Sequence, residues 1–234
     1  MLKFTSHLIR SFILLILACT FCYFFLDRPV AKLMYTLNHF FIAGPTLDNA
    51  SLMSDLTAVA YLIIMLLMIW YAFERIYKNK NTRLMRCICL ISLSVGIAFF
   101  VKTNLQFFFG RIGPRYSDTA KLVFSRNDAL YGFHFFQGGG GSFPSGHMCV
   151  FTSALLIPCY FYPKLKWFFY ALLGLLAFLL IFCNYHFLSD VIAGTYLGAF
   201  IASTLVRLNN LNGPRSDQAA LVFGTDAPQN PASK

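Results

Sequence analysis

Six long apolar runs are the feature that most constrains how this chain can fold. About 20 consecutive apolar residues are long enough to cross the roughly 30 Å hydrocarbon core of a bilayer. The runs occupy residues 8–26, 55–73, 87–109, 147–162, 167–183 and 189–206. They lack the alternation of apolar and polar residues that is typical of transmembrane β-barrel strands. The sequence therefore predicts an all-α fold, a bundle of six transmembrane helices.

Composition disfavours the soluble alternatives. Hydrophobic residues make up 58% of the 234 residues and charged residues 12%, and the mean hydropathy is +0.63. A soluble domain carries about 25% charged residues, because it must cover its exterior with polar groups. The first run continues to Leu26 without a small-residue cleavage site, so we interpret it as an uncleaved span and not as a signal peptide.

The positions of Lys and Arg predict the orientation, since cytoplasmic loops carry an excess of both. With the N-terminus in the cytoplasm, 12 of the 19 Lys and Arg residues lie on the inner side. Both termini are then cytoplasmic, and the third and fifth connections face the periplasm of a bacterial inner membrane. This topology explains most of the basic excess, so we expect a membrane partner and no nucleic acid.

We divide the chain into three parts. Residues 1–54 hold the first transmembrane helix and an outer connection, residues 55–207 form the membrane core, and residues 208–234 are a polar cytoplasmic tail that we expect to be disordered. The seven cysteines lie inside apolar runs, and no cluster with metal-ligand spacing is visible. We therefore expect no metal and no cofactor.

The connection between the third and fourth runs ends in a pattern suited to an anion. Four glycines at 138–141 precede Pro-Ser-Gly-His at 144–147, where the fourth run begins. The free N–H groups of a helix N-terminus bind anions, glycine lets the backbone approach, and Ser145 adds a hydroxyl. Alone, a glycine run is more often a flexible turn. With Arg111 and Arg115 nearby, a phosphate is the expected ligand.

Two histidines border spans on the same outer side, so they can share one site. His147 opens the fourth run, and His186 lies between the fifth and sixth runs, four residues before Asp190. That spacing lets the carboxylate hold Nδ1–H and leaves Nε2 as a nucleophile. Alternatively, Asp190 caps the sixth helix and His186 is an interfacial residue. Lys102, inside the third run, either snorkels to the interface or joins the site.

These residues resemble the last two motifs of the type 2 phosphatidic acid phosphatase superfamily of membrane lipid phosphatases, which is related in fold to the vanadium haloperoxidases. The resemblance covers roughly residues 55–207. It implies that His186 attacks phosphorus and forms a phosphohistidine, with Asp190 orienting it. His147 would protonate the leaving alkoxide and then activate water, while Ser145 and the Gly146 N–H would stabilise the phosphate oxygens. Such a scheme needs no metal.

Several phosphate-binding cations of the family pattern are missing. The first motif, Lys, six residues and Arg-Pro, and the Ser-Arg of the third motif are both altered. The replaced positions are Gln106 and Gly113 in the first motif and Leu179 and Leu180 in the third. We predict that Arg111, helped by Lys102 or Arg115, binds the phosphate instead.

The sequence thus predicts a metal-independent phosphatase that hydrolyses a lipid phosphate monoester in the outer leaflet. Lipid A phosphate, phosphatidic acid and phosphatidylglycerol phosphate are candidate substrates. One alternative is an undecaprenyl diphosphate phosphatase, and another is a phosphotransferase in which a second lipid intercepts the phosphohistidine. A third is a non-catalytic lipid-binding membrane protein that kept the fold, which the missing cations favour.

Overall fold

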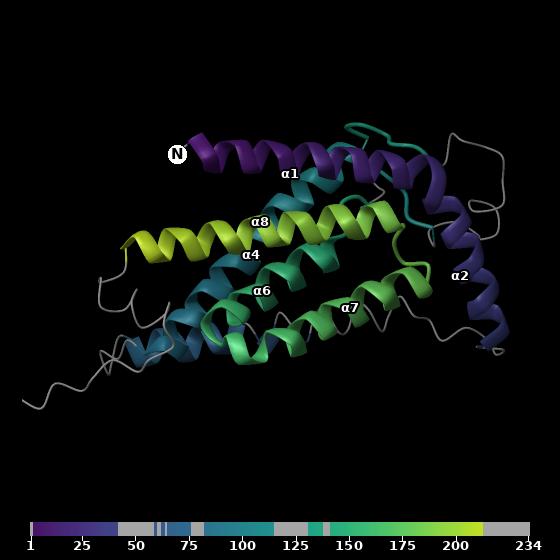
Figure 1. Cartoon of the computed structure of the whole chain (residues 1–234). Helices are drawn as coiled ribbons and strands as arrows, with labels where there is room; N and C mark the ends of the chain where they lie inside the picture. Colours follow the sequence, from purple (N-terminus) through teal and green to yellow (C-terminus); the bar gives the residue numbers. More distant parts are fainter. Residues whose placement is uncertain are drawn as a thin grey trace, which may run out of the picture.

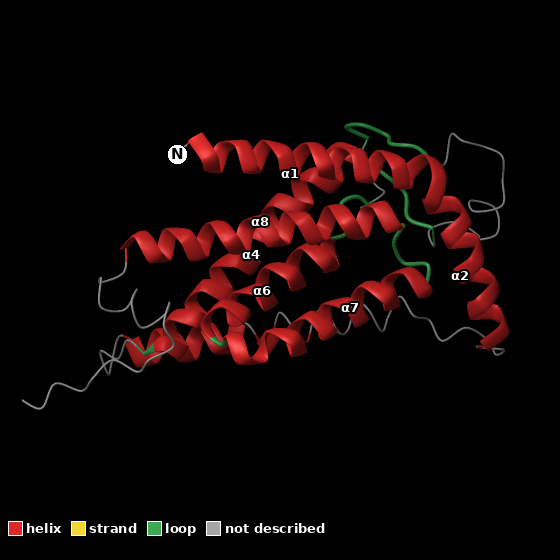
Figure 2. Ribbon diagram, in the orientation of Figure 1, coloured by secondary structure: helices red, strands yellow, loops and turns green. Residues whose placement is uncertain are grey.

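The structure is a computed structural model that describes residues 2–41, 59, 62–63, 65–75, 82–114, 131–137 and 141–212. Regular structure in these residues is helical (Figure 2), apart from one isolated antiparallel bridge between Ile112 and Gly141. The prediction of an all-α fold is confirmed.

The helices from residue 83 onward follow the predicted apolar runs closely. The described helices are α1 (Leu2–Phe21), α2 (Asp27–Phe41), α4 (Arg83–Phe109), α6 (Gly146–Phe161), α7 (Lys166–Phe182) and α8 (Leu188–Asn212), with helical backbone also at 65–75. A π-helical turn, η1 (Cys22–Leu26), joins α1 to α2, and a 3-10 turn, η3 (Pro163–Leu165), precedes α7. Four stretches of the described chain are long and apolar enough to cross a membrane, whereas α6 has 16 residues and is shorter.

The first predicted span ends at residue 26, but the helical structure does not end there. The chain stays helical through η1 and continues as α2 to Phe41. A π-helical turn holds one residue more per turn than the α-helix and is a recognised cause of bends. In Figure 1, α1 runs along the bundle, and α2 turns away from it across one end.

Helix α6 is the centre of the bundle and packs against α4, α7 and α8. Gly194 and Gly198 of α8 face α6 so closely that a Cβ at either position would collide with the carbonyl oxygen of Ser145 or Cys149. Small residues four apart are typical of close helix pairs in membranes. The first turns of α6 and α8 therefore meet, and the Ser145 N–H donates to the Asp190 carbonyl oxygen at 3.0 Å.

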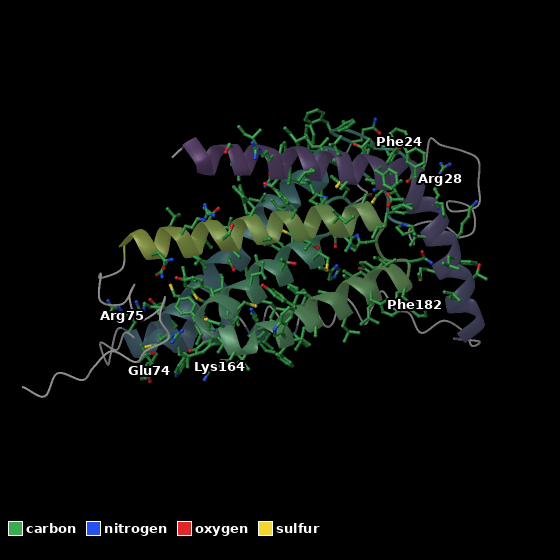
Figure 3. All side chains as sticks on the ribbon, in the orientation of Figure 1. Phe24, Arg28, Glu74, Arg75, Lys164 and Phe182 are labelled. Atoms are coloured by element: carbon green, nitrogen blue, oxygen red, sulfur yellow. The ribbon has the colours of Figure 1, made fainter. Side chains whose placement is uncertain are left out.

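The loops that carry the two histidine motifs lie toward the end of the bundle that α2 crosses (Figure 2). Figure 3 places Phe24, Arg28 and Phe182 at this end, and Glu74 and Lys164 at the opposite end. The loops that carry the histidine motifs and Lys164, one of the basic residues predicted to be cytoplasmic, thus lie at opposite ends of the bundle.

Candidate active site

A cavity of about 170 Å³ opens between the C-terminal part of α4, the first turn of α6 and the turn before α8. Its described lining consists of Lys102, Gln106, Gly141, Gly146, His147, Val150, Phe151, Tyr185 and His186. The ring centroids of His147 and His186 are 5.8 Å apart, with the planes inclined at 63°. Both histidines, which the sequence predicts to share a site, therefore lie in the wall of one cavity.

One ring nitrogen of His186 has neighbours that hold it, and the other has no hydrogen-bond partner among the described residues. Its Nδ1 lies 3.3 Å from the Ser142 hydroxyl oxygen and 3.8 Å from Oδ2 of Asp190. Its Nε2 has no hydrogen-bond partner among the described residues, although the side chain is buried. A hydroxyl that accepts Nδ1–H would leave the Nε2 lone pair available to a substrate.

Asp190 is fully buried and accepts hydrogen bonds on both carboxylate oxygens. Oδ2 accepts from the Ser142 hydroxyl at 2.5 Å and from the Phe187 N–H at 3.0 Å, and Oδ1 accepts from Nη1 of Arg111 at 2.7 Å. The two interpretations of Asp190 are therefore compatible, since it caps the first turn of α8 and also faces Nδ1 of His186. The Ser142 hydroxyl lies between the Asp190 carboxylate and Nδ1 of His186 and contacts both, so it connects the carboxylate to the ring.

Arg111 is fully buried between two carboxylates and is not among the described residues that line the cavity. Nη1 also donates to the Ser189 hydroxyl at 2.7 Å, and Nη2 donates to Oδ2 of Asp27 at 2.8 Å. Burial disfavours its charged form, but Asp190 and Asp27 outweigh burial, and the pKa of Arg111 lies above its ordinary value. The guanidinium carbon lies 4.4 to 5.2 Å from four ring centroids, those of Tyr23, Tyr131, Phe133 and Phe187.

Lys102 is the one Lys or Arg in the described lining of the cavity. Its Nζ lies 3.5 Å from Oε1 of Gln106, and Nε2 of Gln106 donates to the Pro144 carbonyl oxygen at 3.0 Å. A Cβ at Gly146 would come within 3.1 Å of the Lys102 chain, so glycine lets the lysine lie against the start of α6. Gln106 therefore holds the Pro-Ser-Gly-His segment at Pro144, and Lys102 supplies the positive charge of the cavity wall.

The remaining predicted binding residues lie in different places. The Ser145 hydroxyl accepts from the Met148 N–H at 3.3 Å as the N-cap of α6, and its side chain is fully buried. Gly146, which follows it, lines the cavity. Arg115 lies outside the described residues. Contact of Ser145 or Arg115 with phosphate stays a prediction.

Packing explains two of the missing family cations. A Cβ at Gly113 would lie 3.1 Å from the Ser142 hydroxyl oxygen and 3.2 Å from the Tyr185 carbonyl oxygen, so an arginine here would have to displace these neighbours. Leu180 is fully buried in an apolar cluster with Met148 and Val191. Neither position could hold a charge without rearranging its surroundings.

Three polar residues of this region were not predicted from the sequence: Asp27, Tyr131 and Ser142. The Tyr131 hydroxyl donates to the Tyr23 carbonyl oxygen at 2.7 Å, and burial, followed by the nearby Asp27, raises the pKa of Tyr131. Asp27 could have been noticed as a carboxylate at the end of an apolar run, where ionisable groups are functional candidates. Ser142 and Tyr131 carry no comparable signal.

Comparison with known proteins defines the class of protein. The model of the PAP2 superfamily matches residues 87–214, and the chain belongs to this superfamily. The family resemblance seen in the sequence is confirmed.

Among solved structures, the chain resembles the crystal structure of the first transmembrane PAP2 type phosphatidylglycerolphosphate phosphatase, from Bacillus subtilis. The TM-score is 0.51 at 17% identity, over 87% of this chain and 98% of that one. This likeness supports the predicted fold. A search of curated proteins gives no significant match.

Proposed function

We propose that this protein is a membrane phosphatase that hydrolyses a lipid phosphate monoester through a phosphohistidine on His186. The observation that carries the proposal is the pair of histidines on one cavity. Nδ1 of His186 lies within hydrogen-bond distance of Ser142, which Asp190 holds in turn, and Nε2 has no described partner. A buried imidazole oriented in this way is a suitable nucleophile, and the second histidine is close enough to serve the leaving group.

The reaction has two steps. In the first, Nε2 of His186 forms a bond to phosphorus while the bond from phosphorus to the ester oxygen breaks, and His147 gives its proton to the departing alkoxide. In the second, His147 takes a proton from water, whose oxygen attacks phosphorus and releases His186 and inorganic phosphate. The same group acts first as acid and then as base, as the reversal of the chemistry requires.

Lys102 and the first turn of α6 bind the phosphate in this proposal. Lys102 supplies a charge at the cavity wall, and Gly146 lies where the α6 backbone N–H groups have no partner inside the helix. The contacts of Arg111 with Asp27 and Asp190 favour a different role, in which Arg111 holds Asp190 in place and does not touch phosphate.

The substrate is a lipid whose phosphate lies at the periplasmic edge of a bacterial inner membrane. Both histidines border apolar helices and line one cavity, so a headgroup can enter while the acyl chains stay in the bilayer. Lipid A phosphate, phosphatidic acid and phosphatidylglycerol phosphate are the candidates to compare. Undecaprenyl diphosphate is the alternative with a diphosphate group.

Release of inorganic phosphate from this lipid panel by the purified protein in detergent tests the proposal. Wild type should release phosphate from at least one lipid, with or without EDTA. His186→Ala and His147→Ala should each abolish release. His134→Gln, which replaces a described histidine outside the cavity, is the matched control.

Full turnover by His186→Ala would contradict the nucleophile. Labelled phosphate recovered on a second lipid would identify a phosphotransferase. Lipid binding without release of phosphate by the wild type would identify a non-catalytic binding protein.

A further inference from the structure

The N-terminal helices reach the candidate catalytic centre through Asp27. This residue opens α2, directly after the π-helical turn η1, and its side chain is fully buried. It lies outside residues 87–214, the segment that matches the family model. Turns of this kind occur frequently at functional sites.

The contacts of Asp27 converge on the residues around Asp190. Oδ2 accepts from Nη2 of Arg111 at 2.8 Å and from the Ser189 hydroxyl at 2.5 Å, and Oδ1 accepts from the Ser189 N–H at 2.9 Å. The Tyr131 hydroxyl lies 3.5 Å from Oδ2. Asp27 therefore holds both the cation that binds Asp190 and the first turn of the helix that carries it.

A second contact from α2 supports the turn that carries His186. With its amide nitrogen toward Ala31, Asn184 donates to the Ala31 carbonyl oxygen at 3.1 Å and accepts from the Tyr35 N–H at 3.0 Å. Asn184 has a φ of 52°, in the left-handed region that asparagine tolerates better than most residues. Helix α2 thus contacts the chain on both sides of His186, at Asn184 before it and at Ser189 after it.

The charges give Asp27 a further effect. Arg111 is shared between two carboxylates, so Asp27 takes part of the guanidinium charge that Asp190 would otherwise receive. Asp190 then retains negative charge toward Ser142 and His186, and in a buried site this charge is weakly screened. A negative environment stabilises the positive imidazolium that forms when His186 takes up phosphorus.

We propose that Asp27 is a positioning residue of the phosphotransfer centre, which acts through Arg111 to set the position and charge of Asp190 behind His186. The role rests on the proposed function. It makes the N-terminal segment part of the active centre, although the family model does not match that segment.

The Asp27→Asn variant tests this role, because it keeps the shape of the side chain and removes the charge. We expect kcat for phosphate release to fall by up to about 100-fold with KM unchanged. Asp27→Glu keeps the charge but moves it by one methylene, so kcat should fall as well. Glu74→Gln removes a buried carboxylate at the opposite end of the bundle (Figure 3) and is the matched control, with wild-type turnover.

The titration of His186 distinguishes positioning from a merely structural role. The groups that face it are Ser142 and Asp190 with Arg111 behind them, His147 from α6, Lys102 from α4 and the neighbouring Tyr185. Loss of the Asp27 charge removes stabilisation of the imidazolium. The titration midpoint of His186 can be followed by NMR of ¹⁵N-histidine-labelled protein in micelles, with the signal assigned from His186→Gln. In Asp27→Asn this midpoint should move to lower pH. In Asp27→Glu it should stay in place.

A lower kcat with the shifted midpoint supports the role of Asp27. Wild-type kcat in Asp27→Asn, or a lower kcat with an unmoved midpoint, overturns it. If Asp27→Asn does not fold, Asp27→Glu decides, since wild-type kcat in that variant also overturns the proposal. If wild type releases no phosphate from any lipid, the proposed function fails, and the NMR midpoint alone decides for or against Asp27.

Discussion

The Ser142 hydroxyl is the only described atom within hydrogen-bond distance of Nδ1 of His186, so its removal tests how the nucleophile is oriented. Oγ lies 3.3 Å from Nδ1 and donates to Asp190 at 2.5 Å, whereas Nδ1 and the nearer carboxylate oxygen are 3.8 Å apart. Ser142→Ala leaves Asp190 bonded to Arg111 and Phe187. The carboxylate should stay in place while His186 loses its partner.

The magnitude follows from the kind of hydrogen bond that is lost. A hydrogen bond to a charged group contributes about 1.5–3 kcal/mol. Each 1.4 kcal/mol or so in the activation free energy changes the rate about tenfold. If the whole contribution is expressed in the transition state, kcat of Ser142→Ala should fall roughly 10- to 150-fold, with KM unchanged.

The assay is steady-state release of inorganic phosphate from the best lipid of the panel in detergent. Ser153→Ala is the matched control, because Ser153 is a buried serine of α6 whose hydroxyl donates to the Val150 carbonyl oxygen, away from the cavity. It should turn over at the wild-type rate. A folded Ser142→Ala variant with wild-type kcat would show that His186 is oriented without this hydroxyl and would refute the reasoning.

Two further substitutions separate phosphate binding from positioning. Lys102→Met removes the one cation of the described lining, so KM should rise about tenfold or more, in proportion to a lost charge-assisted hydrogen bond; an unchanged KM would remove Lys102 from the binding site. Arg111→Gln leaves two buried carboxylates without their shared cation, so the free energy of unfolding in detergent should fall by about 3–5 kcal/mol, and kcat should fall while KM stays constant. A stable Arg111→Gln variant with raised KM and normal kcat would restore Arg111 as a phosphate ligand.

The sequence predicts the parts of the site that depend on local order. His186 and Asp190 are separated by one helical turn, and Pro-Ser-Gly-His precedes an apolar run, so both histidines were expected at helix borders on one side of the membrane. The structure places them on one cavity, 5.8 Å apart between ring centroids. Apolar runs also locate the membrane helices from residue 83 onward, because the number of consecutive apolar residues needed to cross the hydrocarbon core can be counted in the sequence.

The partners of Arg111 could not be predicted in the same way. Proximity in sequence to the first motif suggests a phosphate ligand, but the guanidinium is bound by Asp27, 84 residues earlier, and by Asp190, 79 residues later. These contacts exist because a π-helical turn continues the first helix and because Gly194 and Gly198 let α8 approach α6. The π-helical turn has no periodic sequence signature, so the end of the apolar run at residue 26 does not show that the chain stays helical beyond it. The two glycines, four residues apart, indicate close helix packing but do not specify the partner helix.

Direct detection of the covalent intermediate tests the central claim, that His186 is the nucleophile. The protein is mixed with a lipid bearing ³²P in its phosphate, quenched in alkali within the first turnover, digested and analysed by mass spectrometry. The account predicts phosphate on His186, absent from His186→Ala, and an increased amount in His147→Ala if that variant forms the intermediate faster than it hydrolyses it. Phosphate on another residue, or turnover in which no phosphohistidine forms at position 186, would contradict it.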